Sequence, residues 1–208
     1  MKLFFALCCY FFATAVYADA LAPDAQIQKL TDEAVAIAIA RQDIDIRAGS
    51  RTKINELIDA RVLPHFNFSR MTALALGRNW PKASVEQQTA LTNAFRSLLV
   101  RTYSSALTSY KNQVIEVRPL RAATEATDVT VRTQIRQPGS APISIDYSME
   151  KTPGGWKVYD VVVGGVSLVT NYRESFNAEI RSGGVDGLIK TLEAKNRPKE
   201  AQVSTKSG

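Results

Sequence analysis

The stretch WKVYDVVVGGVSLVTNYRESF, residues 156–176, carries a strand directly into a helix and sets the character of the fold. Its strand half is apolar on both faces. Alternation places Trp156, Val158 and Val162 on one face. The same alternation places Tyr159, Val161 and Val163 on the other face. A strand with two apolar faces needs cover on both, so we expect helices on one side and either more helix or a ligand on the other.

The glycine pair after this strand, Gly164 and Gly165, is expected to mark the bend where the strand leaves the sheet. Ser167 then lies near the start of a helix, where its hydroxyl can bond to the backbone. Helical spacing continues over residues 169–181 and again over residues 185–195, with a second glycine pair between them. The stretch therefore predicts a strand followed by two consecutive helices.

The chain upstream has the pattern of helices followed by strands. Apolar periodicity predicts helices over residues 24–46, 51–62, 69–76 and 84–110. Ser69 is expected to cap the third helix, and Ser84 with Gln87 has the form of a capping box at the fourth. Alternating strands follow over residues 114–120, 128–136 and 143–150. These elements predict the α+β class, with a small, strongly curved antiparallel sheet that forms a cone with helices and encloses an apolar cavity.

Residues 1–18 have the pattern of a secretory signal peptide, with Lys2, an apolar run and small residues up to Ala18. The run is short for a membrane span, which needs about 20 residues. Both cysteines of the chain lie in this segment, so the exported chain would have no disulfide, zinc–thiolate site or cysteine nucleophile. We expect residues 19–195 to form a single domain and residues 196–208 to be a polar, disordered tail.

The basic character of the chain does not indicate a nucleic-acid partner. The formal net charge is +6 at pH 7, but Lys2 and the C-terminal tail carry most of it. The body of the chain keeps only about +2, which is weak for a nucleic-acid-binding face.

Catalytic chemistry has little support in the sequence. A serine hydrolase is disfavoured because Ser167 lacks the second glycine of a nucleophile elbow, and the single histidine, His65, lies far upstream at a helix boundary. No cluster of residues has the spacing of a metal site. The better enzymatic alternative is an isomerase or cyclase that uses Asp160 in an apolar pocket, although alternation puts Asp160 and Tyr159 on opposite faces. A pure interaction module without a cavity is a third possibility.

Two blocks of the chain resemble the MlaC family, also called the toluene-tolerance auxiliary proteins. The blocks are residues 63–107 and 154–192, and they contain LG-x-x-W, F-x-x-L-L-x-x-x-Y, GWKVYDV and GVSLV-x-x-Y-R-x-x-F in that order. Asn67 stands where the family pattern has Asp, and Gly164 where it often has a longer residue. The resemblance implies a fold similar to nuclear transport factor 2 and a soluble, periplasmic phospholipid carrier rather than an enzyme.

Such a carrier would shuttle lipid between an outer-membrane lipoprotein–porin complex and an inner-membrane ABC transporter complex, which maintains the lipid asymmetry of the outer membrane. The implied carrier is a monomer without a cofactor, and phospholipid is its cargo. Its domain at residues 19–195 would be the lipid-binding domain.

The apolar pattern suggests which side chains would line the lipid-tail pocket. From the long helix and the strands we expect Phe95, Leu99, Tyr103, Val131, Ile145, Tyr147, Val161 and Val163. From the opening stretch and beyond we expect Val166, Val169, Tyr172 and Leu188. Arg70 and Arg173 are the candidates for contact with the headgroup. Trp156, Val158 and Val162 are expected to be plain core, and no catalytic or metal-binding residue is expected.

Overall fold

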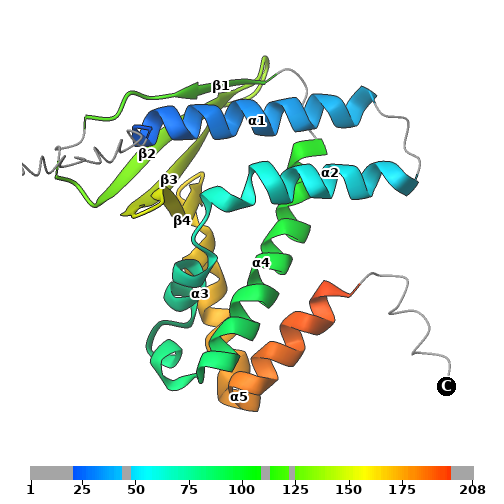
Figure 1. Cartoon of the computed structure of the whole chain (residues 1–208), viewed down its shortest axis with the longest axis vertical. Coiled ribbons are helices and arrows are strands. Elements are labelled where there is room, and N and C mark those ends of the chain that lie inside the picture. Colours follow the sequence, from blue (N-terminus) through cyan, green and yellow to red (C-terminus); the bar gives the residue numbers. More distant parts are fainter. Residues whose placement is uncertain (1–20, 44–47, 109–112, 122–124, 198–208) are drawn as a thin grey trace, which may run out of the picture.

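The computed structural model describes residues 21–43, 48–108, 113–121 and 125–197 (Figure 1). The signal peptide expected at residues 1–18 and nearly all of the tail expected at residues 196–208 lie outside these ranges. Within them, no helix has both the length and the apolar character needed to cross a membrane.

The described elements follow the expected order of helices, strands and a final helical segment. The helices are α1 (Pro23–Asp43), α2 (Ala48–Arg61), α3 (Phe68–Leu76), α4 (Val85–Thr108) and α5 (Leu168–Asn196), with 3₁₀ turns η1 (Leu63–His65) and η2 (Gly77–Lys82). The strands are β1 (Val114–Val117), β2 (Asp128–Arg136), β3 (Ile143–Thr152), β4 (Gly155–Val163) and β5 (Val166–Ser167). The two helices expected after the last long strand form the two parts of α5, which meet at Gly184, where φ is 68°.

The strands form one antiparallel sheet in the order β1-β2-β3-β4-β5. At Gly164 and Gly165 the expected exit from the sheet is wrong. Their φ values of 56° and 86° form a two-residue hairpin, the backbone that glycine adopts without strain. Val163 therefore pairs with Val166, and the chain enters α5 only after the short strand β5.

A β-bulge in β4 overturns the expected division of its two faces. Ser148 pairs with Asp160 and Met149 pairs with Val158, so Tyr159 is an extra residue without a partner in β3. Because one residue is inserted, Val158 and Val161 lie on the same face. Both are buried in one core cluster, although simple alternation separates them.

Helix α1 covers part of the sheet face that carries Val158 and Val161. Ile27 and Leu30 of α1 are buried against Val131 of β2 and Met149 of β3. The second part of the core lies among α3, α4 and α5, which pack together at one side of the sheet (Figure 1). The molecule thus has a sheet that α1 partly covers, and the helices α3, α4 and α5 pack together beside it.

Local hydrogen bonds fix the ends of the helices that matter for the site. The capping box of α4 is confirmed, because Gln87 N donates to Ser84 Oγ at 3.2 Å and Ser84 N donates to Gln87 Oε1 at 3.0 Å. The expected cap of α3 is wrong: Asn67, rather than Ser69, accepts from the backbone N–H of Arg70 at 3.0 Å. Asn67 thus provides the cap that an Asp would provide at this position.

Candidate functional site

An apolar cavity of about 540 Å³ lies between the sheet and the helices. Its helical wall comes from α2 to α4 and the segments between them, through Ile58, Val62, Leu63, Phe66, Phe68, Met71, Leu99, Val100 and Tyr103. Its opposite wall comes from β3, β4, β5 and the start of α5, through Ile145, Tyr147, Val161, Val163, Val166, Leu168 and Asn171. The volume lies within the range of about 300–1,000 Å³ that is usual for ligand sites.

Among the described residues that line this cavity, none carries a charged side chain. Its polar side-chain groups belong to Tyr103, Tyr147 and Asn171. Burial raises the pKa of Tyr147 to about 12, against a weaker opposing effect of its hydrogen bond with Thr133. Burial also raises the pKa of Tyr103, and the neighbouring Tyr172 adds to this shift. Both phenols are therefore neutral at pH 7, and the cavity suits an apolar guest rather than proton transfer.

One end of the cavity is open to solvent. Val166 is 58% exposed, and Val163 and Tyr103 are each 37% exposed. Met71 and Leu99, by contrast, are buried. The exposed apolar residues include both ends of the Gly164-Gly165 hairpin, so this tight turn stands beside the opening.

The structure brings seven of the twelve expected wall residues to this cavity. They are Leu99, Tyr103, Ile145, Tyr147, Val161, Val163 and Val166. The other five lie in packed core instead, and they are Phe95, Val131, Val169, Tyr172 and Leu188. Whether each of the twelve touches lipid stays a prediction.

The five core residues have specific packing partners. The ring of Phe95 makes edge contacts with Tyr172 and Phe176, with centroids 5.1 Å and 5.0 Å away. Val169 and Leu188 belong to the same cluster. Val131 lies under α1. The apolar stripe of α4 therefore packs against α5 near Phe95 and faces the cavity only from Leu99 onward.

Sequence reasoning missed the contribution of the segment between α2 and α3. Val62, Leu63, Phe66 and Phe68 line the cavity because this segment runs beside β4, where Phe66 forms a parallel bridge with Val158. Asn67 N also donates to Val158 O at 2.8 Å. The apolar residues on either side of His65 were a signal of a partly buried segment.

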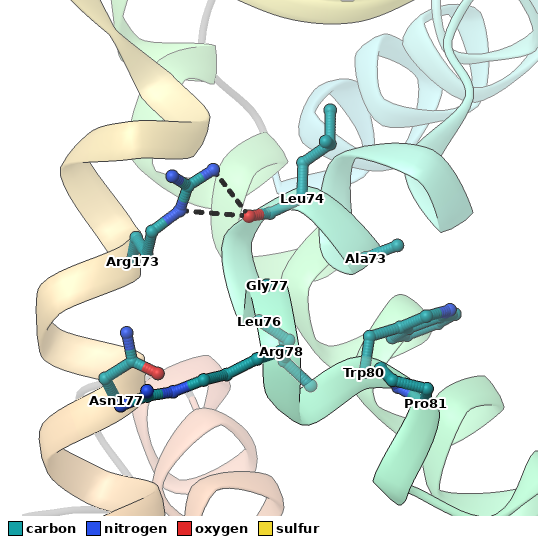
Figure 2. Close-up of a pocket in the computed structure, with 9 residues that line it drawn as sticks. All are labelled: Ala73, Leu74, Leu76, Gly77, Arg78, Trp80, Pro81, Arg173 and Asn177. Carbon is teal, nitrogen blue, oxygen red and sulfur yellow. Dashed lines mark hydrogen bonds between the residues drawn. The ribbon is translucent and has the colours of Figure 1, made fainter.

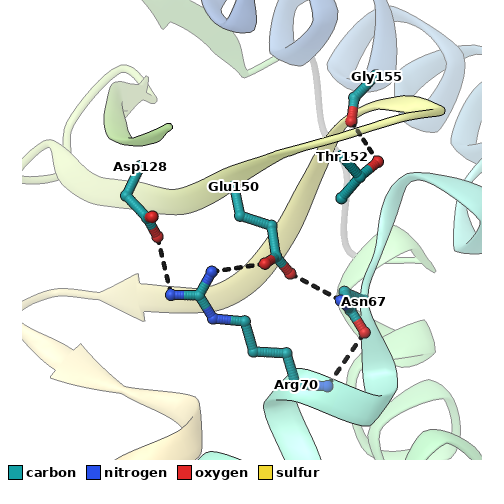
Figure 3. Close-up of polar contacts among 6 residues, drawn as sticks. All are labelled: Asn67, Arg70, Asp128, Glu150, Thr152 and Gly155. Atoms are coloured by element: carbon teal, nitrogen blue, oxygen red, sulfur yellow. Dashed lines mark hydrogen bonds and ion pairs between the residues drawn. The ribbon is translucent and has the colours of Figure 1, made fainter. Parts of the chain in front are cut away.

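Arg70 lies in a polar cluster that joins α3 to the sheet (Figure 3). Its guanidinium donates to Glu150 at 2.6 Å and to Asp128 at 2.8 Å. Glu150 also accepts from Asn67 Nδ2 at 2.7 Å. Burial alone would lower the pKa of Arg70, but the hydrogen bonds and charges of Glu150 and Asp128 raise it. These contacts give Arg70 a structural role, while headgroup contact by Arg70 stays a prediction.

Arg173 and Asp160 also serve the backbone. Arg173 donates through Nε and Nη2 to the carbonyl oxygen of Leu74, at 3.1 Å and 2.9 Å. Asp160 accepts from Val161 N at 2.8 Å, Ser167 Oγ at 2.6 Å and Val169 N at 3.1 Å. Ser167 in turn accepts from Thr170 N and is the N-cap of α5. Both carboxylate oxygens of Asp160 thus hold the start of α5.

No metal-binding arrangement occurs in the described part of the chain, where no group of three or more His, Cys, Asp or Glu side chains could hold an ion. The single histidine ends η1, as expected for a helix boundary, and its Nδ1 lies 3.3 Å from Gln26 Nε2. Burial lowers the pKa of His65.

Comparison with known proteins gives three relatives, two of which are named for phospholipid binding or transport. A phospholipid-binding protein from Ralstonia solanacearum, solved in complex with a phospholipid, has 38% sequence identity and a TM-score of 0.74 over 87% of this chain and 98% of that chain. The intermembrane phospholipid transport system binding protein MlaC of Haemophilus influenzae is 30% identical over 64% of this chain and 63% of its own length. Toluene tolerance protein ttg2D of Pseudomonas putida is 30% identical over 54% of this chain and 51% of its own length.

The matched regions thus span about half to two thirds of the two curated relatives. The model of the MlaC protein family matches residues 28–194, which include every helix and strand from α2 to β5 and most of α1 and α5. The cavity and the sheet that encloses it fall within this match, and the chain therefore belongs to the MlaC family.

Proposed function

We propose that this chain is a periplasmic phospholipid carrier that holds acyl chains in the cavity between the sheet and α2–α4. The observation that carries the proposal is the uncharged wall of a cavity of about 540 Å³, open where Tyr103, Val163 and Val166 are exposed. Further support comes from the phospholipid bound to the Ralstonia solanacearum relative. A fold similar to nuclear transport factor 2 fits the same features, because its curved sheet closes around a pocket.

The energy of lipid transfer explains why such a wall is required. Burial of one CH₂ contributes about 0.8 kcal/mol, so roughly 30 methylenes would cost on the order of 24 kcal/mol to expose to water. A bilayer covers the same groups equally well. The carrier therefore needs to shield the acyl chains from water about as completely as a bilayer does. The direction of transport must come from its partners.

The remaining parts of the proposal follow from family membership. The partners are an outer-membrane lipoprotein–porin complex and an inner-membrane ABC transporter complex, and the consequence is outer-membrane lipid asymmetry. A monomeric carrier without cofactor or catalytic activity is sufficient for this role. The alternative, an isomerase or cyclase acting through Asp160, is disfavoured because this carboxylate bonds to Ser167 and to two backbone N–H groups instead of lining the cavity.

The test is the lipid content of the protein without its first 18 residues. We expect organic extraction and mass spectrometry to yield close to one phospholipid or more per chain, and the delipidated protein to take up labelled phospholipid from vesicles. A protein that is lipid-free in repeated preparations and takes up no lipid from vesicles contradicts the proposal. Asp160→Asn distinguishes the two hypotheses. A carrier with this substitution that still folds should keep its lipid, whereas an enzyme that acts through Asp160 should lose its activity.

A further inference from the structure

A second hollow of about 540 Å³ lies between the α3–η2 corner and α5, and none of its residues lines the lipid cavity. We call it the η2 groove. Its apolar surface includes Leu76, Trp80 and Pro81, and its polar groups come from Arg78, Arg173 and Asn177 (Figure 2). Figure 2 shows the side chain of Arg78 extending toward Asn177 on α5, with Trp80 and Pro81 on the η2 side.

Hydrogen bonds between elements hold the groove in shape. Arg173 of α5 donates twice to the carbonyl oxygen of Leu74 at the end of α3. Asn79 of η2 donates to Asn177 Oδ1 at 2.8 Å, and Gln88 of α4 donates to the carbonyl oxygen of Trp80 at 3.1 Å. Because the walls are tied to one another before any ligand arrives, binding there would cost little ordering entropy.

The groove also holds positive charge without a matching negative charge. Among the described residues, no carboxylate forms an ion pair with Arg78 or Arg173, and Arg78 is exposed. Three other described arginines do form ion pairs with acids, namely Arg70, Arg96 and Arg136. A ligand that brings a carboxylate to Arg78 would therefore meet a guanidinium that has no acid of its own.

We propose that the η2 groove binds an acidic peptide segment of a partner protein. An apolar side chain of the segment would pack on Trp80 and Pro81, and an Asp or Glu would pair with Arg78. The amide NH₂ of Asn177, whose oxygen already accepts from Asn79, would donate to the peptide backbone. Tryptophan and arginine together are the residue types that contribute most energy at protein interfaces, and the arginine fork suits a carboxylate.

This site does not depend on lipid carriage. The groove and the cavity share no residue, so a bound segment would leave the cavity opening at Tyr103 and Val166 uncovered. A protein held at the groove could thus keep hold of the carrier while lipid enters or leaves elsewhere.

The first experiment selects binders from a random library of twelve-residue peptides displayed on phage, with the protein lacking its first 18 residues as the target. We expect enriched peptides to contain Asp or Glu next to an apolar residue. Synthetic copies are then measured with Trp156→Phe protein, which leaves Trp80 as the only tryptophan. Binding should change the Trp80 fluorescence. If this variant does not fold, calorimetry with the unsubstituted protein gives the same affinity.

Two charge reversals identify the site. Arg78→Glu should weaken the selected peptides at least tenfold, while Lys190→Glu, an exposed α5 residue outside the groove, should change their affinity less than twofold. Affinity should also fall as salt screens the ion pair. The lipid content of Arg78→Glu should equal that of the unsubstituted protein, which separates failure of this proposal from failure of the carrier proposal.

Several results would overturn the inference. These are no enriched peptide, enriched peptides without acidic residues, or equal loss of affinity in Arg78→Glu and Lys190→Glu. A fourth is binding to phosphatidylglycerol vesicles that Arg78→Glu abolishes while no peptide binds, because the groove would then recognise a lipid surface.

Discussion

The guanidinium carbon of Arg70 lies 3.6 Å from the centroid of the Tyr159 ring. The same group pairs with Asp128 and Glu150, so one side chain of α3 contacts β2, β3 and β4. The ring it covers belongs to the bulged residue of β4. Arg70 therefore holds α3, which carries the wall residues Phe68 and Met71, against the sheet at its point of irregularity.

Loss of the contacts between Arg70 and the sheet should destabilise the fold. We expect Arg70→Ala to lower the free energy of unfolding by about 1–3 kcal/mol, since it leaves the half-buried Glu150 without its cation and removes a cation–π contact. Urea denaturation followed by circular dichroism measures the change. Arg136→Ala is the matched control, because its pair with Glu116 is exposed on both sides and should contribute no more than about 0.5 kcal/mol. Equal midpoints for the two variants would contradict the structural role of Arg70.

Cavity and core residues of α4 should respond differently to substitution. Val100→Trp places a large side chain at the wall, so we expect a loss of more than half of the bound lipid with a small change in stability. Phe95→Leu disturbs the contacts with Tyr172 and Phe176. It should cost about 1–2 kcal/mol and leave the lipid content near that of the unsubstituted protein.

Both quantities are measured on the same preparations, by phosphorus analysis of extracted lipid and by thermal unfolding. The opposite pattern, with lipid lost in Phe95→Leu and kept in Val100→Trp, would place the acyl chains in the helical core instead.

The raised pKa of Tyr147 predicts a loss of stability at high pH. Its pKa is about 12 in the folded protein and about 10 when unfolded, so above pH 10 the unfolded chain releases its proton first. The stabilising contribution of the Tyr147 proton is complete below pH 10. The free energy of unfolding then falls by about 2–3 kcal/mol as the pH rises to 12. Absorbance titration at 295 nm of delipidated protein should reveal a tyrosine that loses its proton near pH 12. Tyr147→Phe should remove that step, and a titration unaltered by Tyr147→Phe would contradict the assignment.

Asp160 should prove to be a structural residue. Asp160→Asn keeps the shape but weakens an arrangement in which the carboxylate accepts from Ser167 Oγ and Val169 N. We expect a loss of about 1–2 kcal/mol at the start of α5, measured by hydrogen exchange of the α5 amides, with lipid uptake preserved. Abolished uptake in a variant with normal α5 protection would point to a direct role of Asp160 in the cavity.

Local signals in the sequence were sufficient for most elements. The capping box at Ser84 and the periodicity of α4 depend only on neighbours in the chain, and both are present in the structure. Hydrophobic patterning likewise predicted the mixed helix and antiparallel-sheet class. These features could be predicted because residues at most four positions apart determine them.

Features that depend on distant partners could not be predicted in the same way. The stripe of α4 is apolar at both Phe95 and Leu99, and only the position of α5 decides that Phe95 is core. The structural contacts of Arg70 were not predicted, because Asp128 and Glu150 lie far along the chain and are brought to it by the sheet. Composition alone does not separate a side chain that touches a ligand from one that touches protein.

The extra residue Tyr159 has a consequence for which atoms a guest would meet. If the same sequence paired with β3 without a bulge beyond Val158, Asp160 would take the place opposite Tyr147 that Val161 occupies, and a carboxylate would enter the wall. With the insertion, that carboxylate turns to the first turn of α5 and a valine faces inward. The bulged pairing at Tyr159 therefore decides whether a valine or an acid faces the contents of the cavity, and relatives that keep an acid at this position but pair it in a regular strand would be the ones to examine for catalysis.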